Sequence, residues 1–236
     1  MQIPELLHRS IFHLVILQQF QYTFLRMATL VLVRHGKSEW NEKGLWTGWR
    51  DIPLAPRGFD EAKETGSQLR DIHFDLAYTS ALIRAQQTLQ TILEEINQTS
   101  IPTTQDKALN ERDYGDYTEK NKWDIQREMG EEEFQKIRRS WNFPPPNGES
   151  LKMVYERVLP YYKSEIEPKL KSGKNIIIAA HGNSLRALVK HLEDISDDKI
   201  ATLEIGTGEA YVYNIDEEGK IVSKEIRGAN AQKGKV

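Results

Sequence analysis

The stretch that decides the fold is Leu30-Val31-Leu32-Val33-Arg34-His35-Gly36, an apolar run that ends in an arginine, a histidine and a glycine. Such a continuous apolar run is typical of a strand buried on both faces of a parallel sheet. A second apolar run, over residues 175–180, also ends in a histidine and a glycine, at His181 and Gly182. Because ligands bind beyond the carboxyl ends of strands in open α/β sheets, we expect both histidines in one pocket if the strands are neighbours.

Strand and helix patterns alternate along the rest of the chain. Residues 74–79 predict a third strand, and Ser80 is expected to cap a helix over residues 81–96. Further helices are predicted after Pro56, from Leu151 to Leu170 with a kink at Pro160, and from about Asn183, and a closing hairpin is predicted over residues 210–226. This order predicts an α/β fold, with a doubly wound, mostly parallel sheet and helices on both faces.

The first 26 residues differ in character from the rest of the chain. Their apolar run, Ile11 to Leu17, is too short to span a bilayer, and they lack the charged start and small-residue cleavage site of a secretory signal. The scarcity of acids leaves a weak organelle-targeting interpretation open. We expect residues 1–26 to be an extension outside the core, which is dispensable or precedes a natural start at Met27, and residues 27–236 to form a single catalytic domain.

The composition excludes several classes of site. The chain has no cysteine, so disulfides, thiolate catalysis and zinc–sulfur or iron–sulfur centres are excluded. The net charge of −3 gives no overall attraction for nucleic acid, and the basic stretch over residues 227–235 is interpreted as a solvated tail. No glycine-rich nucleotide loop and no spacing typical of metal ligands occurs. We therefore expect no metal, no nucleic-acid partner and no membrane association.

The two histidines, together with Arg34 and Arg84, have the chemistry of a phosphate site. A phosphate group carries a charge of about −1.5 to −2, and a guanidinium can bind two of its oxygens at once. Glycine backbone and helix N-termini beside the histidines supply further N–H donors. These groups suit phosphoryl transfer to a histidine nucleophile, His35. Glu111 lies in a polar stretch between a predicted edge strand and a helix, and it is the candidate acid–base.

Taken together, the motifs resemble a known family, the 2,3-bisphosphoglycerate-dependent phosphoglycerate mutases of the histidine phosphatase superfamily. The resemblance covers roughly residues 29–216 and rests on five segments in matching order, Arg34–Asn41, Trp46–Trp49, Tyr78–Ala85, Asn110–Gly115 and Ala179–Leu188. It implies that His35 is the phosphorylated nucleophile and Glu111 the proton donor and acceptor. It also implies that His181, Arg34 and Arg84 stabilise the transferring phosphoryl group.

The same resemblance implies a substrate site and a reaction. The substrate would contact Arg34, His35, Gly36, Lys37, Ser38, Glu39, Trp40, Asn41, Thr47, Gly48, Arg84, Glu111, Arg112, Asp113, Tyr114, Lys122, Arg138, Arg139, Gly182 and Asn183. The reaction would interconvert 3-phosphoglycerate and 2-phosphoglycerate in glycolysis and gluconeogenesis, in the cytoplasm, with 2,3-bisphosphoglycerate as the phosphoryl donor that primes His35. A homo-oligomer such as a dimer is expected, although the direct link Asn147-Gly148 shortens a loop that is longer in other members.

Two other functions stay open from the residues alone. The first is a phosphatase of small phosphate esters, in which water replaces the second hydroxyl. The second is a catalytically silent module that only binds a phosphorylated ligand. The extra cations Lys122, Arg138 and Arg139 favour the mutase because its ligands carry more than one anionic group. Without the resemblance, Arg138 and Arg139 would be assigned to an exposed helical face, and Glu111 to a solvated surface.

Overall fold

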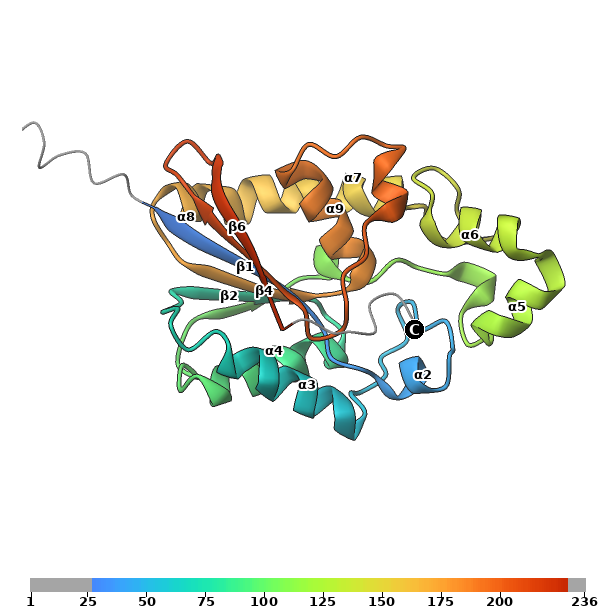
Figure 1. The fold of residues 1–236 in the computed structure, drawn as a ribbon, viewed down its shortest axis with the longest axis horizontal. Helices are drawn as coiled ribbons and strands as arrows, with labels where there is room; N and C mark the ends of the chain where they lie inside the picture. The colour runs from blue at the N-terminus through green and yellow to red at the C-terminus, as the bar shows by residue number, and fades with distance from the viewer. Residues whose placement is uncertain (1–26, 229–236) are drawn as a thin grey trace, which may run out of the picture.

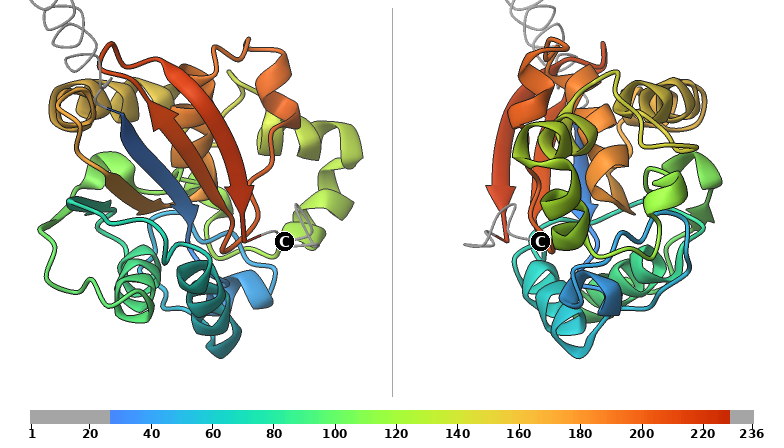
Figure 2. Two further views of the ribbon diagram at one scale, coloured as in Figure 1. Left: turned by 60° about the vertical axis from the view of Figure 1, so that its left-hand side comes forward. Right: turned by 90° about the vertical axis from the view of Figure 1, so that its right-hand side faces the viewer.

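The computed structural model describes residues 27–228 as a six-stranded sheet with helices on both faces (Figures 1 and 2). The strand order is β3-β2-β4-β1-β5-β6. The strands are β1 (Ala28–Arg34), β2 (Leu76–Thr79), β3 (Thr103–Gln105), β4 (Ile176–Ala180), β5 (Ala210–Ile215) and β6 (Ile221–Arg227). The four strands from β3 to β1 run parallel, and the hairpin β5–β6 adds two antiparallel strands beside β1. The predicted mostly parallel sheet is confirmed.

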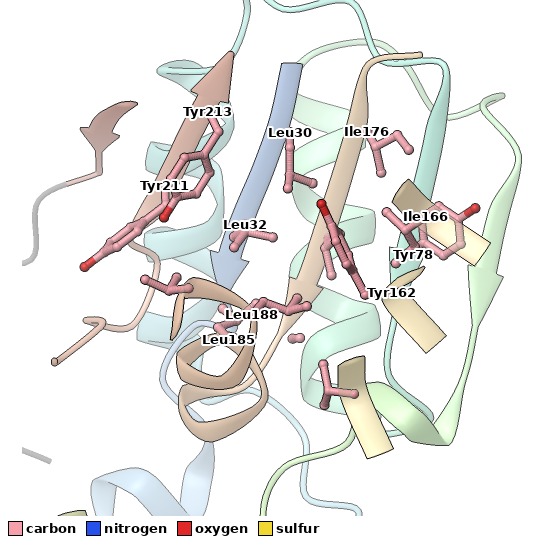
Figure 3. Packing of buried hydrophobic residues seen from close by; sticks show 14 of the residues in the cluster. Leu30, Leu32, Tyr78, Tyr162, Ile166, Ile176, Leu185, Leu188, Tyr211 and Tyr213 are labelled. Carbon is pink, nitrogen blue, oxygen red and sulfur yellow. The ribbon is translucent and has the colours of Figure 1, made fainter. Parts of the chain in front are cut away.

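The apolar run of β1 is explained by two hydrophobic cores, one on each face of the sheet. Leu30 and Leu32 belong to a core with α7 (Leu151–Tyr161) and α9 (Gly182–Leu192), which Figure 3 shows from close by. Val31 and Val33 belong to the opposite core, with α3 (Pro56–Ser67) and α4 (Ile83–Glu95). Because successive side chains of a strand point to opposite faces, both faces of β1 are apolar.

The predicted long helix over residues 151–170 is interrupted. It consists of α7, a π-helical turn (Tyr162–Ile166) and α8 (Glu167–Lys171). Pro160 lies within α7, as predicted, and Pro168 lies in the first turn of α8. In an uninterrupted α-helix the ring of Pro168 would collide with the carbonyl of Ser164, and its missing N–H would leave that carbonyl unbonded. The wider π turn before Pro168 avoids this collision.

The remaining helices lie at the end of the molecule toward which β1 runs (Figure 1). They are α2 (Glu39–Glu42), α5 (Lys122–Met129) and α6 (Glu131–Arg139). Trp46, Ile125 and Phe134 form a small core of their own beneath α5 and α6. The Trp46 ring therefore supports the two helices that carry Lys122, Arg138 and Arg139. No helix of residues 27–228 is long and apolar enough to cross a membrane.

Candidate active site

A pocket opens where β1 and β4 end. Its lining is mostly charged and polar and consists of Arg34, His35, Asn41, Leu45, Trp46, Thr47, Arg84, Glu111, Tyr114, Lys122, Arg138, Arg139, Gly182, Asn183, Arg186, Glu204 and Ile205. Such a lining indicates a strongly anionic ligand.

The two histidines meet because of the register between β1 and β4. Arg34 pairs with Ala180 in this parallel ladder, so the next residues, His35 and His181, leave the sheet side by side. Their ring centroids lie 4.9 Å apart with a 60° angle between the rings. Both side chains are buried, with exposed fractions of 3% and 0%. The expectation that the two strands are neighbours and bring their histidines together is confirmed, and of the two histidines His35 lines the pocket.

His35 is poised as a nucleophile. Its Nδ1 lies 2.7 Å from the carbonyl oxygen of Gly36. A carbonyl oxygen can only accept, so Nδ1 carries the proton in this contact and Nε2 keeps its lone pair. Burial lowers the pKa of His35 well below its usual value, and the charges of Arg84 and Arg34 lower it further. The imidazole is therefore neutral at pH 7, as a nucleophile requires.

His181 is oriented by Ser80, which the sequence pattern assigned to a helix cap. That assignment is wrong, because α4 begins later, at Ile83, and Leu82 occupies the capping position. Ser80 Oγ instead lies 2.7 Å from His181 Nε2 and accepts a bond from the Leu82 N–H. The hydrogen bond between the Ser80 hydroxyl and Nε2 fixes the orientation of the His181 ring. His181 Nδ1 is buried with no partner among the described residues, so it is available to a phosphoryl oxygen.

Arg34 and Arg84 both line the pocket. Arg34, at the end of β1, donates from Nη1 to the Ile205 carbonyl at 2.7 Å, and its Nε has no partner among the described residues. Arg84, in the first turn of α4, donates to the carbonyls of Gly48 and Arg50 at 2.8 and 2.9 Å. Burial lowers the pKa of Arg84 to about 10, so the side chain stays charged at pH 7. These bonds hold both guanidinium groups in place before any ligand arrives.

Glu111 is buried at the pocket wall with an exposed fraction of 7%. Its Oε1 accepts bonds from the backbone N–H groups of Arg112 and Asn183 and from the Asn183 side chain, at 2.7, 3.2 and 3.0 Å. Its Oε2 lies toward Gly182 and Arg34, 3.7 Å from where a β-carbon on Gly182 would be. One oxygen is thus fixed by three donors while the other borders the space left by Gly182. This arrangement suits proton transfer at Oε2.

The backbone around Glu111 is held from outside the pocket by Arg157 on α7. Arg157 donates to the carbonyls of Ala108, Asn110 and Glu111 at 2.7, 3.1 and 2.9 Å. It also forms a bidentate pair with Glu149, whose Oε2 accepts from the Asp113 N–H. This set of contacts, the Arg157 clamp, fixes the segment that carries Glu111 on both sides.

Trp49 adds to the same clamp. Its ring lies under the Arg157 guanidinium, 5.6 Å from centroid to Cζ, and its Nε1 donates to the Glu111 carbonyl at 2.6 Å. Trp49 nevertheless remains 43% exposed.

The outer part of the pocket is cationic. Lys122, at the start of α5, is buried, and this burial, reinforced by Arg138 and Arg34, lowers its pKa to about 7. Arg138 and Arg139, at the end of α6, have lowered pKa values for the same reason, to about 10 for Arg138. Arg186 of α9 donates to Asn183 Oδ1 at 3.0 Å. The mutual repulsion of these cations raises the free energy of keeping their charges buried. An anion that enters the pocket is therefore attracted by all of them and relieves this repulsion.

Eight of the residues expected to contact the substrate lie outside the pocket lining. They are Gly36, Lys37, Ser38, Glu39, Trp40, Gly48, Arg112 and Asp113. Two of them fix the backbone beside the pocket. Ser38 caps α2, and a β-carbon on Gly36 would lie 2.2 Å from the Gly58 carbonyl oxygen, so the two backbones pack directly together. Arg112 is fully buried, 4.8 Å from the Tyr114 ring centroid.

The structure adds residues that the sequence interpretation did not assign to the pocket, notably Arg186, Glu204 and Ile205. Arg186 could have been found, because it lies one helical turn after Gly182 on α9 and therefore on the same helix face. Glu204 and Ile205 belong to an irregular segment before β5, where no periodic pattern exists to signal their position. Among residues 27–228, no group of histidine and acidic side chains is arranged to hold a metal ion.

Known proteins match this chain over most of its length. A model of the histidine phosphatase superfamily, branch 1, matches residues 30–226. The chain is 51% identical over 199 residues to a 2,3-bisphosphoglycerate-dependent phosphoglycerate mutase of Parvibaculum lavamentivorans, covering 84% of this chain and 95% of that protein. It is 52% identical over 199 residues to a phosphoglycerate mutase of Schizosaccharomyces pombe, covering 84% of this chain and 94% of that protein.

Solved structures agree on the fold. A phosphoglycerate mutase from Bacillus anthracis superposes with a TM-score of 0.71 at 24% identity, covering 86% of this chain and 94% of that one. A mycobacterial glucosyl-3-phosphoglycerate phosphatase superposes with a TM-score of 0.69 at 22% identity, covering 85% of this chain and 97% of that one. Mutases and phosphatases share this architecture, so the fold alone does not separate them. Given the matched length and the identity to the two mutases, this chain belongs to the histidine phosphatase superfamily and, within it, to the 2,3-bisphosphoglycerate-dependent phosphoglycerate mutase family.

Proposed function

We propose that the protein interconverts 3-phosphoglycerate and 2-phosphoglycerate through a phosphohistidine at His35. The observation that carries this proposal is the charge of the pocket. Six cationic side chains, Arg34, Arg84, Lys122, Arg138, Arg139 and Arg186, line it together with His35, whose ring contacts that of His181. A single phosphate needs fewer cations, whereas a phosphorylated enzyme with a bound phosphoglycerate carries two phosphates and a carboxylate.

Residues of this chain divide the proposed chemistry between them. Neutral His35 Nε2 attacks phosphorus, the ester P–O bond breaks, and Glu111 gives its proton to the leaving oxygen. In the opposite direction Glu111 takes the proton of a substrate hydroxyl, which attacks the phosphohistidine so that the P–N bond breaks. Arg34, Arg84 and His181 Nδ1 stabilise the charge on the phosphoryl oxygens in both directions.

The relatives' dependence on 2,3-bisphosphoglycerate fits the residues present. Arg34 Nε and His181 Nδ1 have no partner among the described residues, and the His181 ring contacts His35. These two groups would hold one phosphate, and Lys122, Arg138 and Arg139, which line the pocket, would hold a second anionic group. When bound, 2,3-bisphosphoglycerate supplies the phosphoryl group that His35 carries. We infer that it is the cofactor of this chain.

The test follows 3-phosphoglycerate with and without 2,3-bisphosphoglycerate. We expect 2-phosphoglycerate to form and the rate to rise with 2,3-bisphosphoglycerate. Steady release of inorganic phosphate without 2-phosphoglycerate would favour a phosphatase and overturn the proposal. Mass spectrometry after incubation with 2,3-bisphosphoglycerate should detect acid-labile phosphate on the wild type. His35→Ala should retain its fold, carry none of this phosphate and lose at least about 10⁴-fold in turnover. A wild type that gains no phosphate would indicate a silent binding module.

Three further proposals concern the chain as a whole. Residues 1–26, which lie outside the described residues, are a dispensable extension, and deletion of residues 2–26 should leave the specific activity unchanged. The remaining residues act as one catalytic domain. The enzyme works in the cytoplasm as a homodimer, which cell fractionation and light scattering of the purified protein would test.

A further inference from the structure

Glu204 is a charged pocket residue to which the proposed reaction assigns no part. It lies between the 3₁₀ turn Lys199–Thr202 and β5, and its carboxylate forms an ion pair with Arg139. The two side chains are 29% and 19% exposed, so the pair lies at the pocket wall and is reached by solvent. Among the described residues that line the pocket, only Glu111 and Glu204 are carboxylates. Glu111 transfers protons in the proposed reaction, whereas Glu204 only adds negative charge.

The segment that carries Glu204 is anchored on both sides. The Ile205 carbonyl accepts a bond from Arg34 Nη1 at 2.7 Å, and the Ile200 carbonyl accepts one from Arg186 Nη2 at 2.8 Å. The Glu204 carbonyl accepts a bond from the Tyr211 hydroxyl at 3.3 Å. Because its backbone is held in this way, Glu204 keeps its carboxylate beside the pocket when a ligand enters. It is therefore a fixed negative charge in an anion site.

A fixed negative charge discriminates between ligands by their charge. A ligand with one phosphate and one carboxylate carries about −2.5 to −3, and a ligand with two phosphates and one carboxylate carries about −4 to −5. Repulsion from Glu204 scales with that charge, and every ligand must also compete with Glu204 for Arg139. Glu204 therefore reduces the binding free energy of the doubly phosphorylated ligand more than that of the singly phosphorylated one.

We infer that Glu204 is a specificity-determining residue, which weakens binding of a doubly phosphorylated glycerate more than binding of a singly phosphorylated one. This inference rests on the proposed function, in which both phosphoryl groups must visit His35 in turn. A pocket with six cations and Glu111 as its one carboxylate would hold the doubly phosphorylated species too firmly for its two ends to change places. Glu204 keeps that species loosely bound.

The experiment compares Glu204→Gln with Glu132→Gln, measuring dissociation constants by calorimetry. Glu132 lies on α6, as Arg139 does, but it is exposed and outside the pocket, so it controls for the same change in net charge. Both substitutions are made in a His35→Ala background, so that no phosphoryl transfer occurs. We expect Glu204→Gln to lower the dissociation constant of 2,3-bisphosphoglycerate about tenfold and that of 3-phosphoglycerate by clearly less. Glu132→Gln should change neither.

A second readout uses enzyme that retains His35. The concentration of 2,3-bisphosphoglycerate that half-activates turnover should fall in Glu204→Gln and stay unchanged in Glu132→Gln. Unchanged or weaker binding of 2,3-bisphosphoglycerate by Glu204→Gln, or equal gains for both ligands, would overturn the inference. Failure of the proposed function is a separate result, because it would appear as a wild type that forms no 2-phosphoglycerate.

Discussion

Glu111 is the residue whose contacts assign its role most narrowly, because three donors fix Oε1 and Oε2 borders the space beside Gly182. Glu111→Gln keeps the shape but cannot transfer a proton. We expect turnover of phosphoglycerate to fall by about 10² to 10⁴-fold. Hydrolysis of p-nitrophenyl phosphate should fall much less, because its leaving group departs without a proton. Equal losses with both substrates, measured under the same conditions, would show that Glu111 acts in another way.

Lys122 should take up a proton when a ligand binds. Its pKa is lowered to about 7, mainly by burial, so at pH 8 most molecules of the free enzyme hold it neutral. An anion in the pocket favours the charged form and raises that pKa. Calorimetry at pH 8 in buffers of different ionisation enthalpy should therefore detect uptake of about half to one proton per bound 2,3-bisphosphoglycerate. Lys122→Arg, which is always charged, should bind without this uptake.

Among the elements, α7 contributes to the chemistry without entering the pocket, through the Arg157 clamp. Arg157→Gln removes the bonds to three carbonyls and the pair with Glu149. We expect kcat to fall about 10- to 100-fold with a smaller change in KM, because Glu111 loses its position while the ligand-binding cations stay. Arg157→Lys should recover part of the loss.

The matched control is Arg127→Gln on α5, where the arginine is exposed and pairs with Asp124. It should leave kcat unchanged. If Arg157→Gln left kcat unchanged, as this control should, and unfolded at the same denaturant concentration as the wild type, the Arg157 clamp would have no part in placing Glu111.

For the molecule as a whole, the two buried histidines predict loss of stability in mild acid. The folded-state pKa values of His35 and His181 are both depressed, above all by burial. In the unfolded chain they bind protons below about pH 6.5, so the stability that they contribute is complete above that pH and lost as the pH falls below it. Denaturant titrations between about pH 6.5 and 5 should show a decline of up to about 1.4 kcal/mol per pH unit for each histidine. His181→Asn should reduce this slope.

Features of the structure that depend on neighbouring residues can be predicted from the sequence, whereas contacts between residues far apart in the chain cannot. The strands that carry His35 and His181, and the family motifs, are local patterns, and the sheet can be predicted from them. The Ser80–His181 contact spans 101 residues and the Arg157–Glu111 contact 46 residues. Serine and arginine have many roles, so nothing in the neighbouring sequence reveals such partners. The π turn before Pro168 is not predicted, because the sequence pattern assigns the kink to Pro160 alone.

The position of β1 also has a consequence for biosynthesis. β1 is the first strand of the described chain, yet its two neighbours, β4 and β5, are among the last to be made. Until the ribosome has made most of the chain, neither edge of β1 is paired with another strand. Helix α9, which covers Leu30 and Leu32 in the folded protein, is also absent. The nascent protein therefore exposes an apolar, aggregation-prone segment for most of its synthesis, and a chaperone can bind this segment. The pocket is lined by residues from Arg34 to Ile205, so it forms only when nearly all of the chain has been made. A truncated or stalled product should therefore have no activity.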